Sequence, residues 1–437
     1  MISIKRAPVH HGPAAWADIL PTIPVGQSLN DDITADVLVV GAGFAGLSAA
    51  RRLIEIDANL SVVVLEAGRI AEGGTGRNSG FMIDIPHDLA SENYGGGTED
   101  QALITLNRAA QSFAAQMVDE YDVPSDFFDR CGKINGAAST TADVHNTTFM
   151  RHLSTLGEPS ERLDAQEMQR VTGSRYYRSG LYTPGTILLQ PAGYIRGIAN
   201  GLRRQGVKIF EQSPVINLSK GWSARTNTGS VSAKNVILSV NGHLESFGFY
   251  EQRLMHIFLF GAMTAPLQPG TIQGQTRWGI TPSDPMGTTV RRIDGPQGGD
   301  RIVVRSCAAL RPGMRATEGD LRRAKSVMAR KLKVRFPSLD VPLEHVWAGH
   351  LCLSRNGVSV MNELEKGLFS ACVQNGLGTT RGTLTGIGAA EKVMGVTSDI
   401  TRYFDAQDLP TKLPPPSIQT IAGNAVLRWK EHQARSE

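Results

Sequence analysis

Apolar residues with branched side chains are concentrated in a short run near the start of the chain, Val37-Leu38-Val39-Val40. Such a run, bounded by polar residues and glycine, is typical of a buried strand. Between about 44 and 57, apolar residues recur every three or four positions, which is the spacing of a helix. A second apolar run covers residues 61–65. The pattern therefore predicts a strand, a helix and a strand between about 35 and 68.

The rest of the chain alternates between helical and strand patterns. Helical spacing predicts helices at about 99–120, 194–205 and 322–335. Alternating or β-branched runs predict strands at 207–210, 215–218, 222–226 and 236–240, and longer strands of a separate sheet at 254–266, 287–294 and 301–308. Residues 134–182 are mixed, and from about 345 the pattern returns to strand, glycine-rich turn and helix.

Three glycines separate the first predicted strand from its helix, namely Gly41, Gly43 and Gly46. Gly41 permits a tight turn, Gly43 lets a pyrophosphate approach the backbone, and Gly46 lets the helix pack closely on the sheet. The helix start that follows favours negative charge through its free amides and its dipole. Glu66 stands twenty residues after Gly46, where a carboxylate can accept hydrogen bonds from ribose hydroxyls. These residues predict a dinucleotide-binding unit.

Length and composition limit the class of protein. The chain has 437 residues, of which 41% are hydrophobic, enough for about two or three domains with a sizeable core. It has no run of 18 apolar residues, and its start lacks the apolar core of a signal peptide. The four cysteines are scattered without metal-ligand spacing, so we expect no metal site and a reducing compartment. We therefore expect a cytoplasmic protein.

The charge balance points away from nucleic acid. A formal net charge of +4 is too small to predict nucleic-acid binding. The densest basic stretch lies in the predicted helix at 322–335, whose cationic face we interpret as solvated. The alternative is an anionic partner or, at most, peripheral contact with a membrane.

Several motifs resemble a known family. The run Glu66-Ala67-Gly68-Arg69-Ile70, followed by Gly74-Thr75-Gly76-Arg77-Asn78-Ser79-Gly80, resembles a flavin-contact segment of the D-amino-acid oxidase, glycine oxidase and sarcosine oxidase superfamily. It is most similar to the γ-glutamylputrescine oxidoreductase branch. Three later segments resemble the same family in the same order: 190–207, 227–242 and 371–391.

The resemblance implies an α/β fold, in which an FAD-binding Rossmann-like domain of the glutathione-reductase type carries an inserted mixed-sheet substrate domain. It implies that residues 1–34 are an N-terminal lead-in and that residues 35–90, 186–245 and 345–437 form the FAD-binding domain. Residues 91–185 and 246–344 would form the substrate or cap domain.

The resemblance also implies FAD as a non-covalently bound cofactor. A covalent link through Cys352 is a less favoured alternative, because free cysteines are among the most buried residues. Arg77 could pair with a phosphate, lie near the flavin ring, or form a surface ion pair. The expected FAD contacts are Gly41, Gly43, Phe44, Ala45, Gly46, Glu66, Ala67, Arg69, Gly74, Thr75, Arg77, Asn78, Ser79, Gly80, Val215, Asn241, Gly242, Gly376, Leu377, Gly378, Thr379 and Thr380.

The implied reaction oxidises a C–N bond of an amine or amino acid by hydride transfer to the flavin, giving an imine that water hydrolyses. Oxygen or a respiratory electron acceptor would reoxidise the flavin. We name His256, His350 and Arg381 as candidate catalytic residues, although a core histidine and a structural arginine are common alternatives. The candidates for anchoring a substrate anion are Arg292, Arg305, Arg355 and Arg381.

The chain departs from the family pattern at several positions. Val373 and Leu377 stand where relatives tend to have Gly and His, and Asn241 stands where Thr is usual. After Trp347-Ala348-Gly349 the arginine that anchors the substrate carboxylate in glycine oxidases has no counterpart. We therefore expect an amine, rather than a simple α-amino acid bound in the usual way.

Two other functions remain open. A flavoprotein reductase that uses a nicotinamide would need a second complete fingerprint, and the near-matches at 376–381 and 386–391 lack the last glycine. A non-catalytic or RNA-modifying relative of the fold would need a broad basic face, which only the helix at 322–335 offers.

Overall fold

The computed structural model describes residues 1–86, 97–284, 286–434 and 437, and these contain three sheets. The central sheet has five parallel strands in the order β10, β3, β2, β13, β20. The predicted βαβ unit is confirmed within it. The five parallel strands are β10 Lys208–Phe210, β3 Val62–Leu65, β2 Asp32–Val40, β13 Ser230–Leu238 and β20 Leu368–Ser370. The antiparallel additions at the margins are β12 Ser223–Arg225, β11 Asn217–Ser219, β1 Ile2–Ser3 and β19 Glu363–Glu365.

The second sheet is mixed and has eight strands in the order β18, β14, β17, β16, β15, β6, β8, β7. All its pairs are antiparallel except β15 with β6. The strands expected at 254–266, 287–294 and 301–308 correspond to β14, β16 and β17 and confirm the separate sheet. The bounds are β18 Leu343–Ser354, β14 Leu254–Thr264, β17 Arg301–Leu310, β16 Thr289–Ile293, β15 Trp278–Pro282, β6 Lys133–Ala137, β8 Ser179–Thr183 and β7 Glu161–Asp164. A third, small sheet joins β4 Phe81–Met82, β9 Ile187–Leu189 and β5 Phe128–Asp129.

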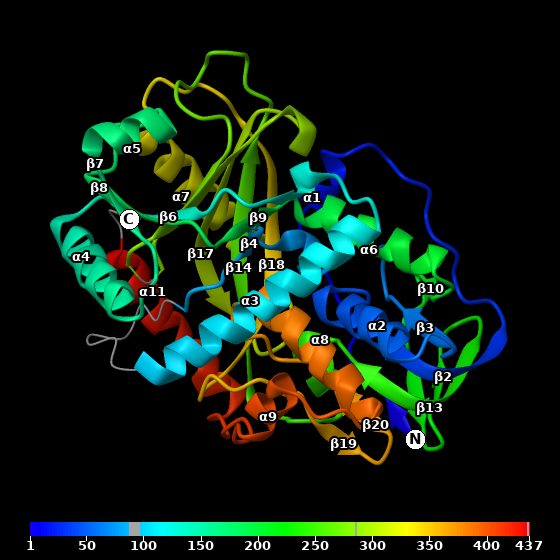
Figure 1. Ribbon diagram of the computed structural model, residues 1–437. Helices are drawn as coiled ribbons and strands as arrows, with labels where there is room; N and C mark the ends of the chain where they lie inside the picture. The colour runs from blue at the N-terminus through cyan, green and yellow to red at the C-terminus, as the bar shows by residue number, and fades with distance from the viewer. Residues whose placement is uncertain (87–96, 285, 435–436) are drawn as a thin grey trace.

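Helices cover both sheets (Figure 1). Helices α2, α3, α6 and α8 pack near one another beside the central sheet and share its main apolar core. Helix α7 packs on the second sheet and contributes to a separate core. The helix bounds are α1 Ala15–Asp18, α2 Phe44–Ile56, α3 Gly97–Glu120, α4 Thr140–Thr155, α5 Ala165–Thr172, α6 Pro191–Arg204, α7 Glu318–Arg335, α8 Thr380–Val393, α9 Asp399–Asp405, α10 Pro416–Ile418 and α11 Asn424–Gln433. Short 3-10 turns include η1 Gly74–Arg77 and η3 Asn241–Phe247. No helix of the described residues is long and apolar enough to span a bilayer.

The structure differs from the expected division of the chain at two places. Residues 345–354 belong to β18, which pairs with β14 in the second sheet rather than with the FAD-binding part. The lead-in at 1–34 contributes β1 and the start of β2 to the central sheet. Both differences arise because strand pairing over long sequence separations leaves no local signal. The expected boundary at 90/91 lies outside the described residues, and the remaining division stays a prediction.

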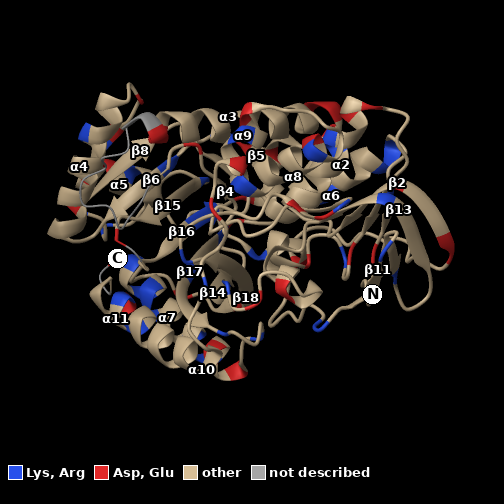
Figure 2. Cartoon of the chain, turned by 90° about the horizontal axis from the view of Figure 1, so that it is seen from below, with Lys and Arg blue, Asp and Glu red and all other residues tan. Residues whose placement is uncertain are grey.

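The basic helix at 322–335 is confirmed as α7, but its cationic face is partly covered. Helix α11 packs beside it (Figure 2), where Arg323 pairs with Glu431 and Lys331 donates to the carbonyl of Ala434 at 3.3 Å. Arg335 is buried and lies 4.5 Å from the ring centroid of Tyr176. The helix therefore presents a smaller basic surface to solvent than its sequence indicates.

Candidate cofactor and active site

One cavity of about 570 Å³ lies between the two large sheets. The central sheet contributes the turn after β2, the residue after β3 and the segment after β13. The second sheet contributes residues of β14, β17 and β18, and segment 374–382 closes another side. The carboxyl ends of parallel strands are the usual place for a bound ligand in such a fold. The volume is within the range of small-molecule sites.

The glycine turn has the geometry of a phosphate site. Gly41 has φ +106°, a left-handed conformation that favours glycine, and its amide donates to the carbonyl of Leu65 at 2.7 Å. A Cβ on Gly46 would lie 1.8 Å from the carbonyl oxygen of Gly41, so any side chain there would push α2 off the turn. Gly43 is the N-cap of α2 and provides no side-chain cap. The first amides of α2 are therefore available to an anion.

Glu66 is held at the edge of the cavity by backbone amides. Its carboxylate accepts hydrogen bonds from the amide of Ala42 at 2.9 Å and from that of Gly68 at 3.0 Å. Burial raises the pKa of the Glu66 carboxyl above its ordinary value, while these amides oppose the shift. The carboxylate therefore lies beside the glycine turn, at the end of the neighbouring strand β3, which fits contact with a ribose.

The structure gives Arg77 a role that differs from the three we predicted. Its guanidinium donates to the carbonyls of Glu72 at 2.7 Å, Gly12 at 3.0 Å, His11 at 3.1 Å and Ala348 at 3.4 Å. Burial lowers its pKa to about 10. Arg77 lines the cavity, but its guanidinium donates hydrogen bonds to these carbonyls. It is therefore not free to bind a phosphate or the flavin ring.

Two of these partners, His11 and Gly12, belong to an N-terminal arm that was not connected with the site from the sequence. The arm runs from β1, beside β11, to Gly12, and its residues 6–10 line the cavity. Gly12 has φ +73°, and a Cβ there would lie 2.2 Å from the carbonyl oxygen of Val346. No glycine or charge motif in this segment signals the contact, because its partners are 60 to 340 residues away.

The loop from 73 to 80 faces the glycine turn. A Cβ on Gly43 would lie 2.7 Å from Thr75 Oγ1, so the loop and the turn approach closely. Asn78 holds the loop through its side-chain oxygen, which accepts from the amide of Gly80 at 2.7 Å. Gly80 itself packs against Arg291 and does not line the cavity.

The closing segment carries backbone strain at the position where relatives tend to have glycine. Val373 is fully buried and has φ +61°, and Asn375 has φ +48°. A β-branched residue in this region costs of order 1–3 kcal/mol. The side chain of Asn241 supports the segment by accepting from the amide of Gln374 at 3.4 Å. Gln374 lines the cavity and was missed by sequence analysis.

Helix α8 begins at the end of this segment. Gly376 and Gly378 line the cavity, whereas Leu377, Thr379 and Thr380 do not. The hydroxyl of Thr379 donates to the carbonyl of Phe81 at 2.7 Å and that of Thr380 to the carbonyl of Ile83 at 2.9 Å. These threonines therefore fix the start of α8 against residues 81–83 and make no side-chain cap.

Two histidines that we predicted to be catalytic lie in contact. His350 on β18 lines the cavity, and its Nε2 is 3.1 Å from Nδ1 of His256 on β14. His256 lies behind it and lines a second cavity of about 220 Å³. Gly242, expected at the flavin, instead packs on this pair, because a Cβ there would be 3.0 Å from His256 Nδ1.

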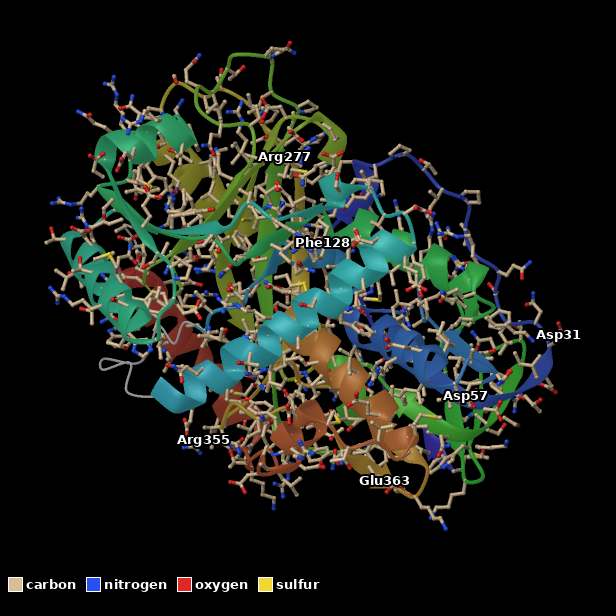
Figure 3. All side chains as sticks on the ribbon, viewed as in Figure 1. Asp31, Asp57, Phe128, Arg277, Arg355 and Glu363 are labelled. Atoms are coloured by element: carbon tan, nitrogen blue, oxygen red, sulfur yellow. The ribbon has the colours of Figure 1, made fainter. Side chains whose placement is uncertain are left out.

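Of the four candidate arginines, the structure brings only Arg305 to the cavity. Arg305 is partly exposed in the cavity wall, and burial lowers its pKa, yet none of the described residues accepts a hydrogen bond from its guanidinium. Arg292 is engaged by Asp300 at 2.8 and 2.9 Å. Arg381 donates to the carbonyl of Gly357 at 3.2 Å and does not line the cavity. Arg355 is exposed and lies at the margin of the molecule in Figure 3.

The covalent alternative finds no support in the geometry. Cys352 is fully buried against Gly242, and burial raises the pKa of its thiol well above the ordinary value. The cavity is lined by His350 and Leu351, its neighbours, but not by Cys352. The described residues contain no cluster of histidine, cysteine or carboxylate side chains that could hold a metal ion.

Most of the predicted cofactor contacts come together. The lining includes Gly41, Gly43, Phe44, Ala45, Glu66, Ala67, Arg69, Gly74, Thr75, Arg77, Asn78, Ser79, Val215, Asn241, Gly376 and Gly378. It omits Gly46, Gly80, Gly242, Leu377, Thr379 and Thr380, which support the walls instead. An uncapped helix start, a carboxylate one strand away and a long apolar chamber fit the phosphates, a ribose and the ring of FAD.

Comparison with known proteins agrees with this fit. The family model of the FAD dependent oxidoreductases (DAO) matches residues 36–392. The probable oxidoreductase OrdL of Haemophilus influenzae is 23% identical over 372 residues, 83% of each chain. The γ-glutamylputrescine oxidoreductase of Escherichia coli is 31% identical over 229 residues, 50% of this chain and 51% of the relative.

Solved structures show the same fold. The glycine oxidase of Geobacillus kaustophilus aligns with a TM-score of 0.67 at 17% identity, covering 87% of this chain and 99% of that one. The L-amino acid deaminase of Proteus myxofaciens, in complex with anthranilate, aligns with a TM-score of 0.67 at 14% identity, covering 93% and 100%. The chain belongs to the DAO family of FAD-dependent oxidoreductases and is an enzyme that uses FAD.

Proposed function

We propose that this enzyme oxidises the C–N bond of an amine or amino acid whose anionic group is held by Arg305. The observation that carries the proposal is the unpartnered guanidinium of Arg305 in the wall of the cavity, on the same side as His350. A buried cation without a counter-charge is costly, and a substrate carboxylate would remove that cost.

The surroundings of Arg305 favour a substrate with an apolar stretch. Its neighbours in the cavity wall are Leu259, Phe260 and Val303, which exclude water. An ion pair made there is screened less than one at the surface. The relatives named above, a γ-glutamylputrescine oxidoreductase, a glycine oxidase and an L-amino acid deaminase, are all named for nitrogen-containing compounds.

Each part of the site has a share in the proposed reaction. When bound, FAD supplies the acceptor for the hydride that leaves the carbon beside the substrate nitrogen. Arg305 orients the substrate, the arm at 6–10 covers the chamber, and His350 faces it with a ring that can accept a proton. The imine product is hydrolysed by water to a carbonyl compound and an amine. Oxygen or a respiratory acceptor would complete the cycle.

The structure favours this function over a nicotinamide-dependent reductase. The near-match at 386–391 lies inside α8, where a Cβ on Gly386 would be 2.2 Å from the carbonyl oxygen of Ala45. Gly386 thus lets α8 pack on α2 and forms no phosphate turn. The RNA-modifying alternative is weakened by the partial cover of α7 described above.

An anaerobic reduction assay tests the proposal. The purified protein, reconstituted with FAD, is mixed with γ-glutamylputrescine, putrescine, sarcosine, glycine, D-alanine or NADPH, and flavin absorbance is followed. We expect bleaching by amines, faster with a longer or N-substituted compound than with glycine or D-alanine. Bleaching by NADPH alone would contradict C–N oxidation. Fastest bleaching by glycine or D-alanine would contradict the preference for a longer substrate, and fastest bleaching by putrescine, which carries no anionic group, would contradict the role given to Arg305.

A further inference from the structure

Two cavities of the molecule meet at one pair of histidines. The main cavity is lined by His350, and the second, about 220 Å³, is lined by His256 and Glu245. The second cavity also includes Lys5, Glu251 and Gln252, all of which are exposed, so it communicates with solvent. The ring pair thus stands between the main cavity and the second cavity.

The three side chains form a continuous hydrogen-bonded chain. His350 Nε2 lies 3.1 Å from His256 Nδ1, and His256 Nε2 lies 2.7 Å from Glu245 Oε2. The register of β14 and β18 pairs His256 with Cys352 and Phe258 with His350, so the two histidines are diagonal neighbours. Phe258 stacks on the His350 ring at 5.0 Å between centroids. These contacts restrict both rings to one orientation.

The protonation of Glu245 bears on which ring nitrogens donate and which accept in this chain of hydrogen bonds. Burial acts to raise the pKa of Glu245, but its hydrogen bond with His256 brings that pKa below the ordinary value, so the carboxylate is ionised and only accepts. The relay requires the tautomer in which His256 carries its proton on Nε2, donates it to Glu245 and accepts at Nδ1. His350 must in turn donate from Nε2, which leaves its Nδ1 with a free lone pair. No described residue contacts that Nδ1.

We propose that Glu245, His256 and His350 form a proton relay from the substrate ammonium group to the second cavity. This inference rests on the proposed function, since hydride transfer requires the neutral amine. One N–H bond of the ammonium breaks as His350 Nδ1 takes the proton. The proton on His350 Nε2 passes to His256 Nδ1, that on His256 Nε2 passes to Glu245, and Glu245 releases a proton to water. No electron is transferred in this step.

The surroundings of His350 disfavour a proton that stays on its ring and favour the transfer of that proton to the next group. Burial, followed by the proximity of His256 and His243, holds the pKa of His350 well below its ordinary value. The other titratable groups near the relay are His243 on η3, Cys352 on β18, and Arg6 and His10 on the N-terminal arm. Glu245 is partly exposed and lines the second cavity. A proton on His350 is therefore driven toward the carboxylate.

The first test reads the hydrogen bonds directly. Long-range ¹H–¹⁵N NMR of the FAD-loaded protein, labelled at histidine, reports which ring nitrogen carries the proton. We expect both rings to carry a proton on Nε2, with Nδ1 of each ring as an acceptor. Glu245→Gln should alter the signals of both rings. Glu251→Gln, a matched change in the same cavity at a carboxylate that pairs with Lys5, should alter neither. Unchanged His350 signals in Glu245→Gln would overturn the relay.

The second test separates a relay from a structural effect. We measure anaerobic flavin reduction from pH 7 to pH 10 with whichever amine of the panel above reduces the wild type fastest. At pH 7, Glu245→Gln should be slower by at least about tenfold, since positioned proton transfer contributes roughly 10²–10⁴-fold. The difference should vanish near pH 10, where the amine arrives neutral. An equal loss at both pH values would contradict the relay, whereas no reduction of the wild type by any amine would contradict the proposed function.

Discussion

Arg305 distinguishes this site at the scale of single residues. Three other arginines were also predicted as candidates for binding the substrate anion, and the sequence did not distinguish among the four. The choice depends on partners: Asp300 engages Arg292, the carbonyl of Gly357 engages Arg381, and Arg355 is exposed. The three-dimensional structure shows that Arg305 lines the cavity and has no hydrogen-bond partner in the part of the chain that the structure describes.

Replacing Arg305 tests its role as an anion anchor. We expect Arg305→Ala to weaken the Kd for the best carboxylate-bearing amine about 30-fold or more, since losing one partner of a buried charged pair costs about 2–5 kcal/mol. Stopped-flow measurement of flavin reduction against substrate concentration gives this Kd. Arg355→Ala, at the exposed margin, is the control. Equal affinities in both variants would argue against an anion at Arg305.

Gly43 tests the position of the pyrophosphate. A Cβ at Gly43 would lie 2.7 Å from Thr75 Oγ1, on the side where the cavity opens. We expect Gly43→Val to be purified folded but without flavin, as judged by circular dichroism and by absorbance. Gly313→Ala, where a Cβ meets nothing within 4 Å, should stay yellow. A yellow Gly43→Val protein would place the pyrophosphate elsewhere.

Among the helices and strands, those whose formation depends on residues close in sequence were predicted well from the apolar pattern. The helix at 44–57 and the strands flanking it appear as α2, β2 and β3 because apolar periodicity and the glycine turn act over short distances. Strand β18 and the N-terminal arm were not assigned to their places, since their partners lie far along the chain. For the same reason Arg77 was expected at a phosphate, near the flavin ring or in a surface ion pair, whereas it binds four carbonyls.

The attachment of the N-terminal arm can be tested through Arg77. We expect Arg77→Lys to lower the free energy of unfolding by about 3 kcal/mol or more, because hydrogen bonds of a charged group contribute roughly 1.5–3 kcal/mol each and one ammonium cannot reach all four carbonyls. Urea unfolding measures the loss. Limited proteolysis should also cut residues 1–12 faster in the variant. An arm that stays equally protected would show that Arg77 does not hold it.

The relation between α8 and α2 explains a second misleading motif. The glycines of 386–391 resemble a nucleotide fingerprint because both uses require a missing side chain. In the helix, Gly386 lies against the backbone of Ala45. Spacing alone does not distinguish a phosphate turn from a close helix contact.

For the whole molecule, the buried histidines predict acid sensitivity. Burial lowers the pKa of His243 to about 4, with His256, His10 and Arg6 facing it. The unfolded chain takes up a proton at this group near pH 6.5, whereas the folded chain does not until about pH 4. The stability it contributes is therefore complete above pH 6.5 and is lost as the pH falls toward 4.

Urea unfolding at several pH values tests the predicted loss of stability at acid pH. One such histidine gives a slope of about 1.4 kcal/mol per pH unit within that window. We expect the free energy of unfolding to fall between pH 6.5 and 4.5, and His243→Gln to reduce the slope by about one proton. A variant with the slope of the wild type would show that His243 is not the group responsible.

For the whole enzyme, we expect FAD on the glycine turn and the substrate between Arg305 and His350. A crystal structure of the FAD-loaded enzyme, reduced anaerobically with the amine that bleaches it fastest, measures this directly. We predict the pyrophosphate at the start of α2, the substrate anion on the Arg305 guanidinium and the substrate nitrogen beside His350. A substrate bound elsewhere, with Arg305 still unpartnered, would contradict the account.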